Sequence, residues 1–281
     1  MLPEQFLNRM KQMLGDEFPA FLESYEQDKY QALRINPQKT TISSFMEKSP
    51  FSLKQVPWEK NGFYYQKTDA PGKHPYHAAG VYYIQEPSAM APAAYLEAQP
   101  GERVLDLCAA PGGKSTQIAA AMGGEGLLIS NEIHPARAKI LSENIERMGI
   151  RNGMVINESP QSLAKIFESY FDRIMVDAPC SGEGMFRKNT DACEEWSPEN
   201  VENCAMRQQE ILTCAAFMLR PGGRIVYSTC TFAPEENEGT ISRFLEEHPE
   251  FHMVEVPLYE GMSPARPEWT KHPAKDLQSG I

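Results

Sequence analysis

The sequence predicts an α/β protein: a doubly wound, mostly parallel sheet that follows a small α+β unit. Short apolar segments rich in Val, Ile and Leu alternate with helical segments from residue 102 onward, as expected when helices cover both faces of a parallel sheet. Residues 104–116 join one strand to one helix through a glycine-rich turn. In such sheets, ligands bind beyond the carboxyl ends of the strands.

The predicted strands are 103–107, 126–130, 153–157, 172–177 and 223–229, and the predicted helices lie near 114–122, 135–148, 160–169 and 198–219. Ser197 is a suitable N-cap for the last helix. Cys204 and Cys214 fall on its apolar face, where they are expected to be core residues, whereas Cys193 is expected in a loop.

The first part of the chain has shorter and less regular elements. The pattern here predicts helices over 3–14 and after a capping Asp16, and a strand at 31–37. It also predicts a short helix capped by Thr40-Thr41, and short strands near Trp58 and at 62–65. The turn-rich segment 68–75 marks a boundary, so we expect an N-terminal domain at 1–75 and a catalytic domain at 76–281. A strand at 79–85 and a helix at 89–96 capped by Ser88 would open the second domain.

Composition limits the class of protein. Apolar residues make up 41% of the chain, but no apolar segment is long enough to span a membrane. The N-terminus has no apolar region of a secretory signal, and the six cysteines form no C-x-x-C pair, which favours free thiols in a cytoplasmic protein. The net charge of −11 means that a polyanionic partner would need a local basic patch. His74 and His77 lack accompanying ligands, so no metal is expected.

The glycine-rich turn favours a nucleoside-containing cofactor. Backbone N–H groups at the start of the 114–122 helix can meet a polar ligand, and Asp106 ends the preceding strand. Glu132 follows Gly112 by 20 residues, a spacing that suits a carboxylate bound to ribose hydroxyls. A phosphate-binding P-loop is the alternative, but Cys108 stands where that loop needs its first glycine. A structural turn without a ligand is the other alternative.

Two cysteines and a carboxylate follow predicted strands. Asp177 ends one strand and Cys180 lies three residues later, while Cys230 follows the next strand. If these strands neighbour the 103–107 strand, both thiols would face the bound ligand. Two thiols at one site suggest either a redox pair or a nucleophile assisted by a second thiol, because the thiolate is a strong nucleophile. The residues alone permit either cysteine as the nucleophile.

The combination of motifs closely resembles the bacterial RsmF and eukaryotic NSUN family of RNA cytosine-5 methyltransferases. The resemblance rests on residues 177–184 (Asp-Ala-Pro-Cys-Ser-Gly-Glu-Gly) together with 228–238 (Ser-Thr-Cys-Thr-Phe-Ala-Pro-Glu-Glu-Asn-Glu). Residues 108–114 match the family's S-adenosylmethionine loop, and 34–37 (Arg-Ile-Asn-Pro) resemble its N-terminal signature. The likeness covers nearly the whole chain, is strongest for the RsmF branch, and implies a Rossmann-like class I methyltransferase sheet.

The resemblance implies roles for individual residues. Cys230 would be the nucleophile that adds to cytosine C6, Cys180 would assist release after methyl transfer, and Asp177 would lie near the cofactor and the cytosine amino group. S-adenosyl-L-methionine would be held by Cys108, Ala109, Ala110, Pro111, Gly112, Gly113, Lys114, Glu132 and Asp177. Lys114 has an alternative role as a solvated lysine of the first helical turn.

The resemblance also implies the partner. The substrate would be ribosomal RNA within the small subunit, with the target base unstacked, and Arg187 and Lys188 are candidates for phosphate contacts. After the third strand the chain reads Asn157-Glu-Ser, where relatives often place Asp, so the adenine contact is open. The family continues with a further strand and a C-terminal RNA-binding domain, so a longer protein is expected. A ribosome-assembly factor with little turnover is the rival function.

Overall fold

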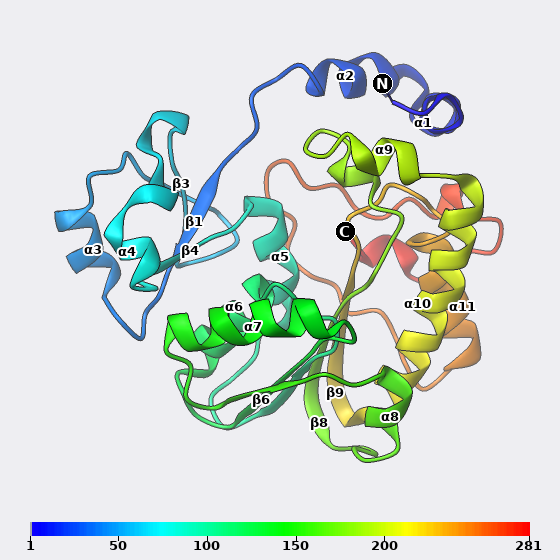
Figure 1. The fold of residues 1–281 in the computed structure, drawn as a ribbon. Coiled ribbons are helices and arrows are strands. Elements are labelled where there is room, and N and C mark those ends of the chain that lie inside the picture. Colours follow the sequence, from blue (N-terminus) through cyan, green and yellow to red (C-terminus); the bar gives the residue numbers. More distant parts are fainter. Residues whose placement is uncertain (1) are drawn as a thin grey trace. The chain divides into compact units, whose positions relative to one another are not determined.

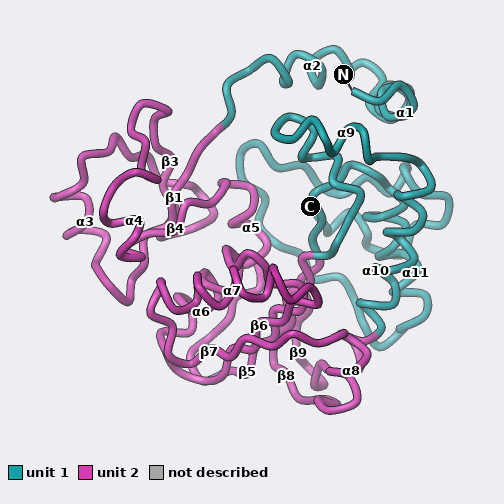
Figure 2. Tube along the Cα trace, viewed as in Figure 1, with its two compact units in different colours: residues 1–29, 178–213, 228–281 teal, residues 30–177, 214–227 magenta. Residues whose placement is uncertain are grey.

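The computed structural model describes residues 2–281, and the chain divides into two compact units (Figure 2). Unit 1 comprises Met1–Lys29, Ala178–Thr213 and Ser228–Ile281, and unit 2 comprises Tyr30–Asp177 and Cys214–Tyr227. Among the described residues no helix has both the length and the apolar character needed to cross a bilayer.

Unit 2 contains the predicted α/β sheet. Its strands are β5 (Arg103–Asp106), β6 (Leu127–Asn131), β7 (Gly153–Ile156), β8 (Phe171–Asp177) and β9 (Leu219–Ser228, whose last residue belongs to unit 1). Their order is β7-β6-β5-β8-β9, and β5 is parallel to both β6 and β8. The strand order therefore reverses between β5 and β8, which confirms the predicted doubly wound fold and makes their carboxyl ends the expected ligand position.

Helices of unit 2 cover one face of this sheet (Figure 1), where α6 and α7 lie side by side. They are α5 (Pro87–Leu96), α6 (Gly113–Met122) and α7 (Pro135–Met148). The core between sheet and helices consists of buried apolar side chains such as Val104, Leu128, Ile118 and Met122. Burial of such side chains contributes about 1.5–3 kcal/mol each.

Helix α7 shows how the sequence sets an element's bounds. Pro135 occupies its first turn, where no backbone donor is needed. Its buried residues recur at helical spacing: Ala138, Leu141, Ile145 and Met148. Gly149 then ends the helix with a φ of 75°. The structure has the predicted bounds, 135–148.

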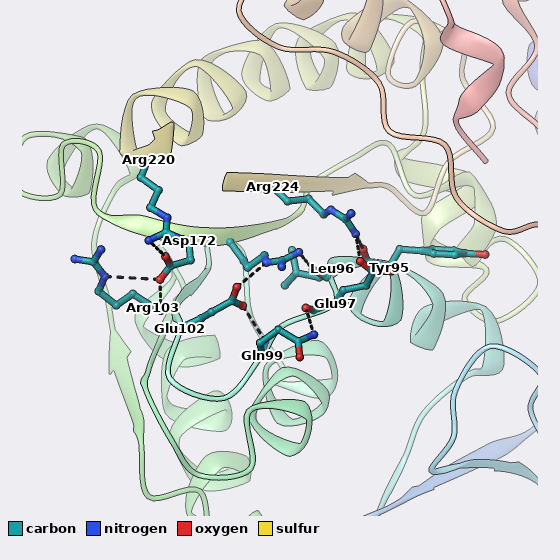
Figure 3. Close-up of polar contacts among 10 residues, drawn as sticks. Tyr95, Leu96, Glu97, Gln99, Glu102, Arg103, Asp172, Arg220 and Arg224 are labelled. Carbon is teal, nitrogen blue, oxygen red and sulfur yellow. Dashed lines mark hydrogen bonds and ion pairs between the residues drawn. The ribbon is translucent and has the colours of Figure 1, made fainter. Parts of the chain in front are cut away.

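Ion pairs join elements at the amino ends of the strands (Figure 3). On β8, Asp172 accepts from the backbone N–H of Arg103 at 2.6 Å and from Arg220 Nη1 at 2.6 Å. Nearby, Arg173 Nε lies 3.1 Å from Glu102 Oε1, and Arg224 Nη1 lies 2.6 Å from Glu97 Oε2. These contacts tie β5, β8, β9 and the end of α5 together at the edge opposite the expected ligand site.

A second, antiparallel sheet in unit 2 has the order β2-β3-β1-β4. Its elements are β1 (Ala32–Ile35), α3 (Ile42–Lys48), β2 (Lys54–Gln55), β3 (Gly62–Tyr64), η2 (Lys67–Asp69), η3 (Pro71–Lys73), α4 (Pro75–Ala78) and β4 (Tyr82–Ile84). Thr41 caps α3 as predicted, by accepting from the Ser44 N–H. Because β4 pairs with β1, this sheet extends past the predicted boundary at 75; the division into 1–75 and 76–281 stays a prediction.

Unit 1 is mainly helical. Its elements are α1 (Glu4–Leu14), η1 (Gly15–Glu17), α2 (Phe18–Ser24), η4 (Glu183–Met185), α9 (Asp191–Glu195), α10 (Pro198–Met218, which ends in unit 2), α11 (Glu238–Glu247), η5 (Pro267–Trp269) and η6 (Leu277–Ser279). Phe6 and Met10 of α1 pack in one buried cluster with Phe186, Trp196 and Ala233. The first helix thus belongs to the same core as residues that lie far from it in the sequence.

Several local predictions were wrong. Asp16 lies inside a 3-10 turn, and Glu86 rather than Ser88 precedes α5. Trp58 lies in a turn, where its indole N–H donates to the Pro87 carbonyl at 2.8 Å. Cys193 lies in α9 and packs against the unit 1 core.

The third helix of the predicted sheet is also shorter than expected. Helix α8 (Pro160–Ala164) ends five residues before the predicted end at 169. Ser169 has a φ of 47°, and its N–H donates to the Phe217 carbonyl at 3.0 Å. This turn directs the chain into β8 and is incompatible with a helix that continues to residue 169.

Candidate active site

A cavity of about 210 Å³ lies in unit 2 at the carboxyl ends of β5 and β8. Its walls come from β4, α5, the glycine-rich turn, the start of α6 and the end of β8. The lining residues are Tyr83, Ile84, Gln85, Ala89, Asp106, Cys108, Ala109, Ala110, Pro111, Gly113, Lys114 and Asp177. The structure thus brings most of the predicted cofactor-binding residues together at one cavity.

The turn is held in place by α7. Asn144 Nδ2 donates to the Pro111 carbonyl at 2.9 Å, and Arg137 Nη2 donates to the Ala110 carbonyl at 3.0 Å. Gly112 has a φ of 111°, and a Cβ there would lie 3.0 Å from Leu141 Cδ1. The position therefore needs glycine both for its backbone conformation and for its close packing on α7.

Asp106 is the buried carboxylate of the cavity. Its Oδ2 accepts from Ser115 Oγ at 2.6 Å, while its Oδ1 has no hydrogen-bond partner among residues 2–281. Burial raises the pKa of this carboxyl to about 7, the nearby Asp177 adds to the rise, and the Ser115 hydrogen bond and Lys114 oppose it. A buried, unpaired carboxylate oxygen on the wall of a cavity suits a cationic ligand group.

Lys114 and Asp177 form an ion pair at the same cavity, with 2.7 Å between Nζ and Oδ2. The Lys114 side chain is only 13% exposed. The alternative of a solvated lysine is therefore wrong, and the ammonium group instead links the start of α6 to the end of β8.

Arg34 supports the turn from the small sheet of unit 2, a role that was not predicted. The fully buried guanidinium donates to Thr116 Oγ1 at 2.6 Å, to the Gly113 carbonyl at 3.1 Å and to Gln85 Oε1 at 3.1 Å. Burial lowers the pKa of Arg34 to about 10. The sequence signal for this role was a single arginine in a predicted strand. A buried arginine needs hydrogen-bond partners, so its position indicated polar groups nearby.

Glu132 does not line the cavity. Its buried carboxylate accepts from the His134 N–H at 3.0 Å and lies 3.4 Å from Arg137 Nη1, the arginine that also holds the turn. Asn157, where relatives often have Asp, supports the backbone of Glu132: its Nδ2 donates to the Glu132 carbonyl at 2.6 Å.

Cys108 does line the cavity. Burial, followed by the nearby Asp106, raises the pKa of its thiol.

The two thiols that follow β8 and β9 lie together in unit 1. The Sγ atoms of Cys180 and Cys230 are 3.1 Å apart, and the Cys230 N–H donates to Cys180 Sγ at 3.3 Å. Cys230 is exposed and Cys180 is partly buried. The hydrogen bond with Cys230 raises the pKa of Cys180, and burial raises it further. Residues 50 positions apart in sequence therefore form one pair of thiols at hydrogen-bond distance.

Polar contacts connect the loops that carry the two thiols. Glu236, fully buried, accepts from the Ser181 N–H at 3.0 Å and from Gln208 Nε2 at 2.8 Å. The hydroxyl groups of Ser181 and Thr231 are 2.9 Å apart. Burial raises the pKa of Glu236, whereas the hydrogen bonds from Ser181 and Gln208 lower it. The glutamate lies in the sequence motif that follows Cys230, but its contacts across the chain were not predicted.

Other candidates lie outside both clusters. Arg187 Nη2 donates to the Gln27 carbonyl at 2.6 Å, so this predicted phosphate contact already has a structural partner. His74 Nδ1 accepts from the Tyr76 N–H at the start of α4. Within residues 2–281 no group of three or more His, Cys, Asp or Glu side chains is arranged to hold a metal ion.

The fold and the cavity at the reversal of strand order define a Rossmann-like class I methyltransferase. The family model "16S rRNA methyltransferase RsmB/F" matches residues 93–276, and that of the N-terminal domain of 16S rRNA methyltransferase RsmF matches residues 2–87. The chain belongs to the RsmB/F family of 16S rRNA methyltransferases.

Individual relatives agree with this assignment. The ribosomal RNA small subunit methyltransferase F of Erwinia tasmaniensis is 38% identical over 90% of this chain and 55% of its own length, so the chain spans about half of that relative. The crystal structure of a methyltransferase homologue from Pyrococcus horikoshii is 28% identical with a TM-score of 0.84, covering 99% of this chain and 88% of that one. NSun6 from Pyrococcus horikoshii, solved with SFG, shares the fold with a TM-score of 0.82 at 20% identity, covering 93% and 91%.

Proposed function

We propose that this chain carries the catalytic machinery for S-adenosylmethionine-dependent methylation of C5 of a cytosine in small-subunit ribosomal RNA. The observation that carries the proposal is the 3.1 Å approach of Cys180 and Cys230 in a chain of the RsmB/F family. Neither thiol is needed for methyl transfer to an ordinary nucleophile such as an amine, whereas C5 of cytosine is a poor nucleophile that needs activation. Addition of a thiolate to C6 provides it.

The geometry of the pair favours Cys230 as the nucleophile. Two thiols at hydrogen-bond distance lose their protons in coupled steps. The hydrogen bond with Cys230, followed by burial, raises the pKa of Cys180, which favours Cys180 as the thiol that keeps its proton. Cys230 is also the more exposed of the two. Release of the methylated base requires loss of the C5 proton to a base and departure of the Cys230 thiolate from C6, and Cys180 lies beside the adduct, where it can assist this step.

The cavity of unit 2 fits the cofactor by its charge. S-adenosylmethionine, when bound, supplies an electrophilic methyl group, and it carries an ammonium group and a carboxylate. The unpaired Oδ1 of Asp106 is a suitable acceptor for the ammonium group. The 108–114 turn and Lys114 would hold the amino-acid part, and Asp177 lines the same cavity. Glu132 would turn away from Arg137, 3.4 Å distant, to reach the ribose hydroxyls.

The substrate class follows from the family. Relatives act, by name, on ribosomal RNA of the small subunit, and we propose the same substrate, in the cytoplasm. A cytosine must leave its stack to meet a thiol. Because the chain carries a net charge of −11, local cations such as Lys188 would contact the phosphates.

The test is methyl transfer to small ribosomal subunits from cells that lack this protein. Tritiated S-adenosylmethionine measures incorporation, and bisulfite sequencing locates the modified base. We expect one or more cytosines to acquire a 5-methyl group with wild-type protein and none with Cys230→Ala. Incorporation that survives in Cys230→Ala, or a methyl group on another atom, would refute the proposal. RNA binding without any incorporation by wild-type protein would instead support an assembly factor.

A further inference from the structure

One buried glutamate connects the two loops that carry the thiols. Glu183 begins η4, three residues after Cys180, and it is fully buried. Its Oε2 accepts from the backbone N–H of Phe232 at 3.0 Å, and Phe232 follows Cys230 by two residues. The backbone N–H of the following residue, Gly184, donates to the Cys230 carbonyl at 2.8 Å. The two residues 183 and 184 therefore fix the backbone on both sides of Thr231.

The second oxygen of this glutamate is held by the N-terminal helix. Oε1 of Glu183 accepts from Arg9 Nη2 at 2.6 Å and from Trp196 Nε1 at 2.8 Å. The Arg9 guanidinium also lies over the rings of Phe6 and Trp196, at 5.7 and 5.8 Å from their centroids. Charge-assisted hydrogen bonds are strong and depend on direction, so α1 sets the orientation of the carboxylate.

The loop has little freedom to relax if this carboxylate is altered. A Cβ on Gly184 would lie 2.9 Å from the Cys230 carbonyl oxygen, which shows how closely the two backbones approach. A glutamine at 183 has one acceptor oxygen in place of two and adds an NH₂ donor. It cannot accept from Arg9, Trp196 and Phe232 with the geometry that the carboxylate has.

We propose that Glu183, oriented by Arg9, is a positioning residue that holds the Cys230 thiol at its working distance from Cys180. The effect of Glu183 on methyl transfer rests on the proposed function. Its effect on the distance between the two thiols does not. The N-terminal helix α1 is thereby a structural part of the thiol site, through one ion pair.

The first measurement is the rate at which Cys180 and Cys230 close a disulfide with diamide as oxidant. Diamide takes up the two protons and two electrons that the thiols lose as the S–S bond forms, and the rate reports how often the sulfur atoms meet. Glu183→Gln and the milder Arg9→Lys are compared with Glu17→Gln. This control removes an exposed ion pair with Arg266 in the same unit. All are measured below the unfolding transition of each variant.

We expect Glu183→Gln to slow closure about tenfold or more, Arg9→Lys to slow it less, and Glu17→Gln to leave it unchanged. In the methyl-transfer assay, kcat should fall roughly 10- to 100-fold, as small misplacements of reacting groups do, while KM for S-adenosylmethionine stays the same. Wild-type closure rates in both Glu183→Gln and Arg9→Lys would overturn the positioning role. An inactive wild-type protein with slowed closure in Glu183→Gln would reject the proposed function alone.

Discussion

Lys114 Nζ lies 2.7 Å from Asp177 Oδ2, so one ion pair joins the start of α6 to the end of β8 at the cavity. We predict that Lys114→Met weakens binding of S-adenosylmethionine about tenfold, because the substitution removes the ion pair that links the start of α6 to Asp177. Calorimetry measures the dissociation constant. Arg173→Met is the matched control, since it breaks a partly buried pair with Glu102 at the amino ends of the strands. Equal loss of affinity in both variants would mean that the pair acts only through stability.

Asp106 should make stability and cofactor affinity depend on pH in opposite directions. Its folded pKa of about 7 lies above the ordinary aspartate value of 3.8. Between these values the folded protein binds more protons than the unfolded chain, so the free energy of unfolding falls as the pH rises from about 4 to about 7 and then levels off. Affinity for the cationic cofactor should rise over the upper part of this range as Asp106 ionises.

The variant Asp106→Asn tests both effects. It keeps an acceptor for Ser115 but cannot ionise, so both pH dependences should weaken. Urea unfolding and calorimetry at several pH values provide the measurements. A stability curve for Asp106→Asn that runs parallel to wild type from pH 4 to pH 7 would contradict the assignment.

The thiols should have separable roles in trapping experiments. Cys180→Ala leaves the nucleophile but removes the group that assists release, so a covalent protein–RNA adduct should accumulate. Cys230→Ala should give no adduct. Denaturing gels with labelled RNA detect the complex. An adduct found with Cys230→Ala and absent with Cys180→Ala would reverse the two roles.

Arg34→Lys should destabilise unit 2 by about 2 kcal/mol. A lysine cannot reproduce the planar set of donors to Thr116, Gly113 and Gln85, and buried acceptors left unpaired cost about 1–3 kcal/mol. Urea unfolding measures the change. Arg103→Lys is the control, because the Arg103 side chain is 40% exposed. The short contact of this residue with Asp172 comes from the Arg103 backbone N–H, which lysine keeps. A similar small change in both would show that the Arg34 contacts contribute little.

The sequence predicted those features that local pattern determines. The sheet followed from apolar segments and turn residues, and α7 from its periodicity and its terminal Pro and Gly. The cavity followed from the carboxyl ends of strands. What could not be predicted are buried polar contacts between distant segments. Arg34 meets Thr116 across 82 residues and Arg9 meets Glu183 across 174, and neither residue has a local pattern that names its partner.

Two of the predicted helix caps were wrong, whereas Thr41 and Ser197 accept from the backbone N–H groups of Ser44 and Asn200. Asp16 and Ser88 are good capping residues by type, but the chain enters α2 through a 3-10 turn and α5 through Pro87 at its first position. Pro87 suits the first helical position because no backbone donor is needed there. Strand β4 was predicted as a strand, but its antiparallel pairing with β1 was not. The local sequence of neither strand determines which strand it pairs with.

The two glycines beside the Pro-Cys motif restrict sequence variation for different reasons. Gly182 has a φ of 75°, and a Cβ built there meets no atom within 4 Å among the described residues, so its constraint is the backbone conformation, which Asn or Asp also adopts. Gly184 is constrained by volume, since any Cβ would lie 2.9 Å from the Cys230 carbonyl oxygen. In a saturation library selected for function, position 182 should retain a few residues and position 184 only glycine.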